Sequence, residues 1–407
     1  REEHAMRDRT AQLLSPPYDF HDIETLIRGR IGEVIGAVLE EELETALGAG
    51  RHERTPGRRG YRHASRPARR LMTSFGAIEV EVPRGRLKAE GGTREYESEL
   101  VPRYQRRSRR LDAVVLTSYL VGVNTRKVRL ALRPLVEGTA LSRSAVSRLV
   151  KRLRGLMEGW RSRDLSGETY LILILDAFRV PVRLARRVVR VPVQTVVGVK
   201  EGGERELLEL RLSPSESTRS WQGVVEGLVR RNLAAPILVM LDGNAGLIRA
   251  VRESWPTARI QRCTRHKLEN LLGKAPKHCH GELKRDYDAI VYAQDGREAD
   301  EAYTMFCRKW EKLVPEVVVS LEEGGSELLT FYDFPSEMWK SLRTTNMIER
   351  VNEEFRRRIK TQGSFPTEAS ALILLYGLVA CGAIRLRKID GYRRLADVVA
   401  GAREKSA

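Results

Sequence analysis

Cysteine and long hydrophobic runs are both scarce in this sequence, and each scarcity excludes a class of protein. The 407 residues include four cysteines, which are unevenly spaced and all lie in the C-terminal half. This is not a disulfide framework, so we expect a reducing compartment. The most hydrophobic segment, residues 371–384, is shorter than the ~20 residues that a membrane span needs. We therefore expect a buried helix there, no signal peptide, no membrane partner and a cytoplasmic location.

Negative charge is in short supply as well. The chain carries 72 Lys and Arg against 54 Asp and Glu, which gives a formal net charge of +18 and an isoelectric point of about 10.0. An excess of this size indicates a polyanionic partner, and nucleic acid is the commonest one. A hydrophobic content of 42% and this length are typical of a folded chain of two or three domains.

Residues 1–50 are predicted to form an N-terminal helical segment. Hydrophobic residues recur at helical spacing at Ile23, Ile27, Ile31, Val34 and Val38, and the run ends at a Gly-Ala-Gly sequence. The simplest interpretation is a helix packed on the core of the chain. The alternative is a helix that forms a dimer.

Residues 51–103 are predicted to be a basic arm with short strands. Residues 51–70 contain eight arginines and one acid, and their glycines and prolines prevent a long helix. A solvated linker is possible, but this density of arginine favours an arm that follows DNA phosphates. Hydrophobic residues then alternate with glutamates over residues 78–82, which predicts a half-buried strand. The candidate DNA-binding residues of this arm are Arg58, Arg59, Arg62, Arg66, Arg69 and Arg70.

Residues 104–165 resemble a helix-turn-helix DNA-binding region. The turn is expected near residues 137–139, and Ser142 could cap the second helix. A plain pair of packed helices is the alternative. The early, short or forked side chains that could enter a major groove are Arg143, Ser144, Ser147 and Arg148.

The pattern from residue 166 onward predicts an α/β domain. Residues 166–263 give an element order of βββαβαβ, which suggests a mixed sheet with helices on both faces. Residues 264–342 lose the strand signal and are predicted to be an all-helical insertion. Residues 343–390 supply the last part of the α/β domain, and residues 391–407 a C-terminal tail.

Three carboxylates are candidates for a metal site. Asp176 and Asp242 are each expected to end a buried strand, where ligands bind in α/β sheets. Each could instead cap a turn. Glu349 is the candidate third ligand, or else the capping-box partner of Asn346, three residues earlier. Spacing alone does not choose between these roles, but oxygen donors of this kind would suit Mg²⁺.

A Cys-x-x-His pair, Cys263 and His266, lies between the second and third carboxylates. It could begin a zinc site completed by His278, Cys279 or His280. The alternatives are a positioning role near the active site and simple core packing, and we favour these two because a well-spaced second pair is lacking.

Four segments in this order closely resemble the Mutator-type transposases of bacterial insertion sequences: LDAFRVPVR, LDGNAGL, QRCTRHKLENLL and RTTNMIERVNEEFRRRIKTQGSFP. The resemblance covers residues 23–385. It implies a ribonuclease-H-like catalytic domain with an Asp, Asp, Glu triad and a helical insertion before the Glu. By motif position the triad falls on Asp176, Asp242 and Glu349, which would hold two Mg²⁺ ions that Mn²⁺ could replace. Cys263, His266 and Asn346 would be structural residues near the active site.

The resemblance implies a transposase that binds the terminal inverted repeats of an insertion sequence, cuts them and joins the 3′ ends to target DNA. Double-stranded DNA and further copies of the chain, in a homodimer or larger assembly, would be its partners in the bacterial nucleoid. A transposase-derived, non-catalytic DNA-binding regulator is the alternative, and a nuclease that cuts without joining is a weaker one. The residues expected to hold phosphate near the cut, or else to form a solvated helix face, are Arg356, Arg357, Arg358 and Lys360.

Overall fold

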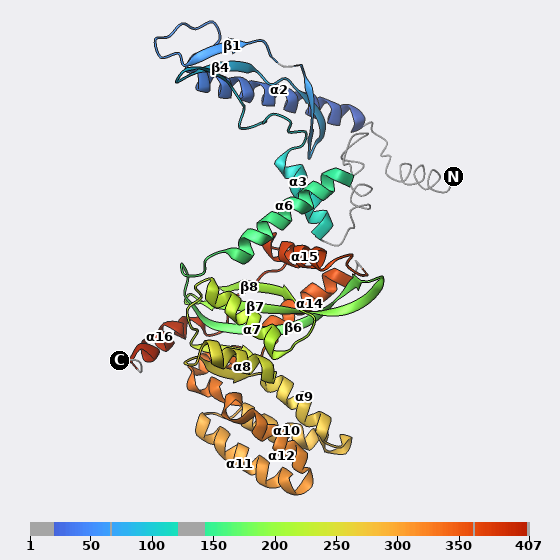
Figure 1. The fold of residues 1–407 in the computed structure, drawn as a ribbon, viewed down its shortest axis with the longest axis vertical. Helices are drawn as coiled ribbons and strands as arrows, with labels where there is room; N and C mark the ends of the chain where they lie inside the picture. Colours follow the sequence, from blue (N-terminus) through green and yellow to red (C-terminus); the bar gives the residue numbers. More distant parts are fainter. Residues whose placement is uncertain (1–19, 66, 121–142, 361–362, 405–407) are drawn as a thin grey trace, which may run out of the picture. The chain divides into compact units, whose positions relative to one another are not determined.

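The computed structural model describes residues 20–65, 67–120, 143–360 and 363–404. This part of the chain divides into two compact units (Figure 1), and the division falls between Leu149 and Val150, within helix α6 (Arg143–Ser162). None of the helices in these ranges is long and apolar enough to cross a membrane.

The first unit packs a long helix, α2 (Phe20–Leu47), against small antiparallel sheets. One sheet has the order β1-β4-β5 and the other is the β2–β3 hairpin. The predicted half-buried strand is confirmed, because Ile78 and Val80 are buried while Glu79 is exposed. The strands are β1 (Gly60–His63), β2 (Arg69–Thr73), β3 (Gly76–Val80), β4 (Arg84–Ala89) and β5 (Gly92–Glu95).

Helix α2 confirms the predicted helix but not its predicted core face. Four of the five hydrophobic residues that define the predicted face are exposed: Ile23, Ile27, Val34 and Val38. The helix instead packs through residues four apart, with Leu39 buried against β2 and β3 and with Leu43 and Leu47 buried near Tyr96. The strands thus bury a different face of α2 from the face that the hydrophobic spacing of residues 23–38 predicts.

Two helices follow in the region predicted to be helix-turn-helix-like, α3 (Arg109–Leu120) and α6. The second predicted helix is therefore confirmed as a helix. The predicted turn at residues 137–139 and the capping residue Ser142 lie outside the described residues.

The second unit contains a five-stranded mixed sheet in the order β10-β9-β6-β7-β8. Strand β6 pairs antiparallel with β7 and parallel with β9, and β9 pairs parallel with β10. This confirms the mixed sheet predicted from the element order. The strands are β6 (Tyr170–Leu184), β7 (Arg187–Lys200), β8 (Arg205–Leu212), β9 (Leu238–Leu241) and β10 (Arg259–Arg262).

Helices cover both faces of this sheet, as predicted. Leu173 and Leu175 share a core with α7 (Thr218–Arg230) and α8 (Ala245–Ser254). Phe178 points to the opposite face, because successive strand residues alternate. There its ring stacks on Phe355 of α14 (Asn346–Lys360) with centroids 5.5 Å apart. The predicted buried helix at residues 371–384 is α15 (Glu368–Ala380), which contacts β6 and β8.

The predicted helical insertion between β10 and α14 is confirmed. The helices between residues 264 and 324 share a core of their own around Trp310 and Phe306. Glycine ends α12, since Gly325 adopts a φ of 53° directly after it. The helices are α9 (Thr264–Lys274), α10 (His280–Val291), α11 (Gly296–Leu313), α12 (Pro315–Gly324) and α13 (Ser336–Leu342).

One prediction about this unit is wrong, and one segment contains an element that was not predicted. Strand β6 does not end at Asp176 but continues to Leu184, because β7 pairs with it along its whole length down to Arg187. The predicted C-terminal tail contains a helix, α16 (Leu395–Glu404), whose first residue is fully buried.

Candidate functional site

Asp176 lies in the middle of the central strand β6 and is 8% exposed. Its Oδ1 accepts the amide hydrogen of Ala177 at 2.8 Å, and its Oδ2 accepts from Nδ2 of Asn352 at 2.6 Å. Burial raises the pKa of this carboxyl group to about 6, and the negative charge of Asp242 adds to the increase. The strand thus holds a carboxylate whose charge the surrounding protein compensates only in part.

Asp242 directly follows β9, the strand that pairs with β6 through Ile172, Leu173 and Ile174. Its Oδ1 accepts the amide hydrogen of Asn244, which itself caps α8. Asp242 is therefore both a strand-end carboxylate and a turn cap, the two roles that the sequence left open. Neighbouring strands bring it close enough to Asp176 for the two charges to repel each other.

Glu349 lies in the first turn of α14, which packs against β6. The alternative of a capping box with Asn346 is not formed, because Asn346 is the first residue of the helix and Thr345 precedes it. The Thr345 carbonyl accepts the amide of Glu349, and its hydroxyl donates to Glu349 Oε1 at 3.0 Å. Asn346 Oδ1 accepts instead from Arg265 at 3.2 Å. The Glu349 carboxylate therefore accepts from the Thr345 hydroxyl and does not form the capping box with Asn346.

Asn352 is a site residue that sequence reasoning missed. It is fully buried, donates to Asp176, and leaves its Oδ1 without a hydrogen-bond partner in the described parts of the chain. A signal was present in the sequence, because Asn352 is three residues after Glu349 on the side of the helix formed by hydrophobic residues such as Val351 and Phe355. A polar residue on that face of a helix calls for a buried partner.

Cys263 and His266 lie beside Glu349. The buried sulfur of Cys263 accepts the amide of Thr345 at 3.4 Å, and Nε2 of His266 is 3.8 Å from Glu349 Oε1. The Cys263 sulfur raises the pKa of His266 to about 9 against the opposing effect of burial, and the charges of Glu349 and Asp176 add to the increase. One histidine thus interacts with two of the predicted triad residues, which shows that β6 and α14 bring them to one place.

The residues fit a divalent cation in two overlapping ways. Asp176, Asp242 and Glu349 offer the hard oxygen donors that Mg²⁺ prefers, and the incompletely compensated charge of Asp176 favours a cation beside it. In the described ranges, Cys263, His266 and Glu349 also offer ligand atoms within 4.8 Å of one another, a donor set that suits zinc. The alternative of a zinc site completed by His278, Cys279 or His280, which we did not favour, is not formed by these described side chains.

The basic residues at the end of α14 lie on the same helix as Glu349. Arg356 stands over the ring of Phe178 with its guanidinium carbon 5.9 Å from the ring centroid, and Arg357 pairs with Glu354 at 2.6 Å. Arg358 is half-buried, whereas Lys360, the last helical residue, is exposed. This helix therefore leads from the carboxylates to a basic surface.

Most of the arginines predicted to bind DNA in the basic arm make contacts within the first unit. Arg62 pairs with Glu40 and Glu44 of α2, and Arg59 donates to the carbonyl of Thr45. Contacts to backbone carbonyls also engage Arg58 and Arg69. Arg70 is exposed, and Arg66 lies outside the described residues. Several of these guanidinium groups thus stabilise the fold, and their contact with DNA stays a prediction.

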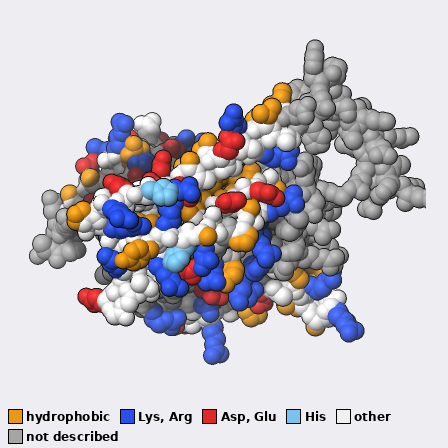
Figure 2. All heavy atoms as spheres, turned by 90° about the horizontal axis from the view of Figure 1, so that it is seen from above, with side chains coloured by type: hydrophobic (Ala, Val, Ile, Leu, Met, Phe, Trp, Pro, Cys, Tyr) orange, Lys and Arg blue, Asp and Glu red, His pale blue; other side chains and the backbone are white. Residues whose placement is uncertain are grey.

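The candidate recognition helix is described only in part. Ser147 and Arg148 are exposed on α6, but the side chains of Arg143 and Ser144 lie outside the described residues. On the face drawn in Figure 2, basic side chains are spread among hydrophobic and acidic ones and do not form one uniform patch.

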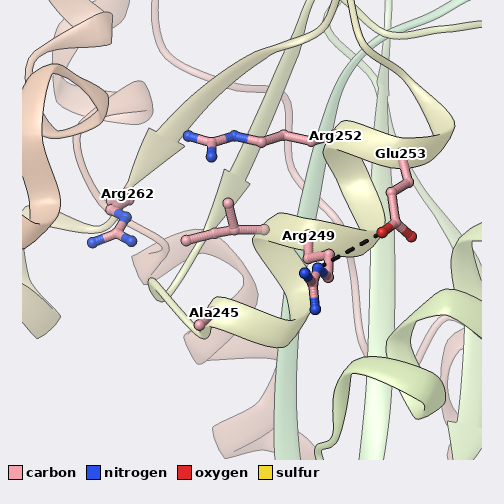
Figure 3. A pocket seen from close by; sticks show the side chains of 6 residues that line it. Ala245, Arg249, Arg252, Glu253 and Arg262 are labelled. Carbon is pink, nitrogen blue, oxygen red and sulfur yellow. Dashed lines mark ion pairs between the residues drawn. The ribbon is translucent and has the colours of Figure 1, made fainter.

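A pocket of about 410 Å³ lies beside α8 and is lined by residues other than the three carboxylates. Its arginines are already engaged (Figure 3): Arg249 pairs with Glu253 along the helix at 3.7 Å, and Arg252 pairs with Glu327. Arg262 also pairs with Glu327, at 3.0 Å. This pocket is therefore a less favourable anion site than its arginine content suggests.

Comparison with known proteins identifies the family. Residues 3–382 match the family model described as "Transposase, Mutator family". The chain is 37% identical over 356 residues to the transposase for insertion sequence element ISRM5 of Rhizobium meliloti (strain 1021), covering 86% of each chain. It is 33% identical to the transposase for insertion sequence element IS1081 of Mycobacterium tuberculosis, covering 87% of this chain and 84% of the relative.

A more distant relative and one solved structure complete the comparison. The transposase for insertion sequence element IS256 in transposon Tn4001 of Staphylococcus aureus is 30% identical, covering 83% of this chain and 85% of the relative. The Drosophila P element transposase strand transfer complex has a TM-score of 0.28 and 10% identity over 71% of this chain and 85% of that chain, too little to assign the fold. The family match and the sequence identities suffice: this chain belongs to the Mutator family of transposases.

Proposed function

We propose that this protein is a DNA transposase that binds the terminal inverted repeats of an insertion sequence, cleaves the DNA there and joins the 3′ ends to target DNA. Family membership supports the general activity. The observation that carries the chemical assignment is the placement of Asp176, a buried carboxylate on a strand that pairs with the strand before Asp242 and packs against the helix of Glu349. We propose a ribonuclease-H-like catalytic domain, which the mixed sheet order supports.

In this proposal the three carboxylates hold Mg²⁺ through their oxygens, and Mn²⁺ can replace it. The ions supply activation of the attacking oxygen and stabilisation of the leaving oxygen. The protein contributes position: Asn352 and the Ala177 amide fix the Asp176 carboxylate, and Thr345 fixes Glu349. Basic residues of α14 hold the phosphate backbone near the cut. Two DNA ends must meet in one complex, so we propose a homodimer or a larger homo-oligomer.

The proposal is tested by strand transfer with a labelled DNA duplex that carries the terminal inverted repeat. Asp176→Ala should abolish both cleavage and joining, and the amide variants Asp242→Asn and Glu349→Gln should do the same while they still bind the duplex. Alanine removes the whole carboxylate, the amides remove its charge and one of its two oxygens, and none of the three substitutions changes a basic residue. Full activity of Asp176→Ala would refute the assignment. Absence of cleavage by the wild-type protein, with normal DNA binding, would favour a non-catalytic regulator.

A further inference from the structure

The β6–β7 hairpin extends beyond the rest of the sheet and is strongly basic. Strand β9 pairs with β6 only at Ile172–Ile174, and β8 pairs with β7 only from Val193 onward, so the two strands continue as a two-stranded ribbon (Figure 1). Residues 177–200 contain five arginines, one lysine and no acid. The family segment LDAFRVPVR includes Arg179 and Arg183, but the resemblance gives a role in this segment only to Asp176.

The ribbon is firmly anchored on the side that faces α14. Val180, Val182 and Val191 are buried, and directly opposite residues such as Val180 and Val191 share a face. The loop after α14 adds main-chain hydrogen bonds, since Arg183 donates to the Phe365 carbonyl at 2.8 Å and the Phe365 amide donates to the Pro181 carbonyl at 2.9 Å. A ribbon held at its base in this way presents its outer face in a fixed orientation.

The outer face and the tip carry the charge. Arg183 and Arg190 lie on the face opposite to the buried valines, and Arg186 and Arg187 are at the turn. All four side chains are exposed, and within the described ranges no acidic group pairs with them, whereas Arg179, nearer the base, pairs with Glu216 at 3.4 Å. Four guanidinium groups are therefore available to a polyanion.

The tip also contains exposed hydrophobic side chains, at Leu184, Val188 and Val189. Its turn is built from Ala185 and Arg186, both with positive φ (44° and 68°), where hairpins favour Asn-Gly. Arginine does not favour this backbone conformation, so the turn geometry does not explain why Arg186 occupies the position.

We propose that this ribbon, residues 179–191, is a second DNA-binding element that enters the major groove of the duplex being cut. The major groove admits a two-stranded β-ribbon, with arginines reaching the phosphates on its rims and hydrophobic side chains reaching thymine methyl groups on its floor. Arg183 is seven residues beyond Asp176, about 23 Å along the strand at ~3.3 Å per residue. The ribbon would thus hold DNA about two-thirds of a helical turn from the cut phosphate. This inference rests on the proposed action on DNA.

The competing explanation is structural. Among the described strands none pairs with the outer edge of β7 at residues 187–191, and charged residues on such an edge prevent sheets of different molecules from pairing. Edge protection works with charge of either sign, whereas DNA binding requires positive charge. Charge reversal therefore separates the two explanations.

The test measures binding of the full-length protein to a fluorescent mixed-sequence DNA duplex in EDTA over a range of NaCl concentrations. Arg183, Arg186, Arg187 and Arg190 are replaced together by Gln, by Lys or by Glu. A control variant replaces four exposed arginines of the same unit by Gln, which removes equal charge: Arg230, Arg249, Arg297 and Arg308.

We expect the Gln variant to bind at least tenfold more weakly and the slope of log K against log salt to become shallower by about 0.9 for each phosphate that is no longer neutralised. The Lys variant and the control should stay near wild type, and the Glu variant should bind most weakly. Wild-type DNA binding by the Gln variant or by the Glu variant would overturn the proposal. If DNA binding is unchanged and the Gln variant alone aggregates or changes its oligomeric state, the charge protects the strand edge and the proposal is also overturned. Because EDTA suppresses cleavage, a failure here is distinct from failure of the catalytic proposal.

Discussion

Asp176 illustrates how one residue can serve the site at a cost to the fold. Its carboxylate is buried, accepts two hydrogen bonds and faces the charge of Asp242. The rise of its pKa from 3.8 to about 6 means that ionisation destabilises the folded state without a cation by about 3 kcal/mol at neutral pH. Such local destabilisation is typical of residues retained for their chemistry.

We predict that Asp176→Asn raises the free energy of unfolding in EDTA at pH 7, by up to about 3 kcal/mol. The raised pKa means that the folded wild type binds more protons than the unfolded chain between pH 4 and pH 6. Wild-type stability should therefore fall as the pH rises through this window, and the fall should be smaller in the variant. Denaturant unfolding at several pH values measures both effects. Exposed Asp300→Asn is the control, and a variant less stable than wild type at pH 7 would contradict the prediction.

At the scale of elements, a buried ion pair connects the end of helix α7 to strand β8, and its arginine also contacts helix α6. Arg231, which follows α7, donates to Glu209 of β8 at 3.1 Å and to the carbonyl of Arg161 in α6 at 3.0 Å. Both members of the pair are less than 10% exposed. Burial raises the pKa of Glu209 in spite of the nearby arginines, so the charge of Glu209 depends on its partners.

We predict that Arg231→Met destabilises the protein by about 1.5 to 3 kcal/mol, because it removes a charged hydrogen bond from the buried Glu209 carboxylate, which then keeps only the partly exposed Arg161 at 3.3 Å. The neighbouring Arg230→Met is the matched control. Arg230 is 71% exposed, and its ion pair with Glu226 is long, at 3.9 Å. This change should therefore cost less than about 0.5 kcal/mol. Thermal unfolding of both variants measures the difference, and equal losses would show that the buried pair contributes nothing beyond its surface counterpart.

At the scale of the whole molecule, the carboxylates and the basic surfaces are expected to act separately. We predict that EDTA abolishes cleavage of an inverted-repeat duplex while duplex binding persists, because phosphate contacts come from arginines and cleavage requires the cation. Added Mg²⁺ or Mn²⁺ should restore cleavage. Gel shifts and cleavage on the same samples provide the readout. Cleavage that persists in EDTA would refute the metal requirement.

Local patterns predicted many of the elements that the structure contains. Alternation identified β3, continuous hydrophobic runs identified β6 and β9, and loss of the strand signal identified the helical insertion. They failed where a long-range partner decides the outcome. The end of β6 depends on pairing with β7 and Phe365, and the buried stripe of α2 depends on the strands beneath it. Asn352 was missed because its partner is far away along the chain.

The sequence by itself determined the charge of the protein, the order of its elements, its family resemblance and the three candidate carboxylates. Those properties follow from composition, periodicity and motif order, which do not depend on the spatial neighbours of each residue. Only the tertiary structure decided that Glu349 is held by Thr345 rather than used as a cap, that Asn352 supports Asp176, and that arginines 183 to 190 project on a ribbon. These are contacts between distant segments, and they are fixed only when the sheet and α14 pack together.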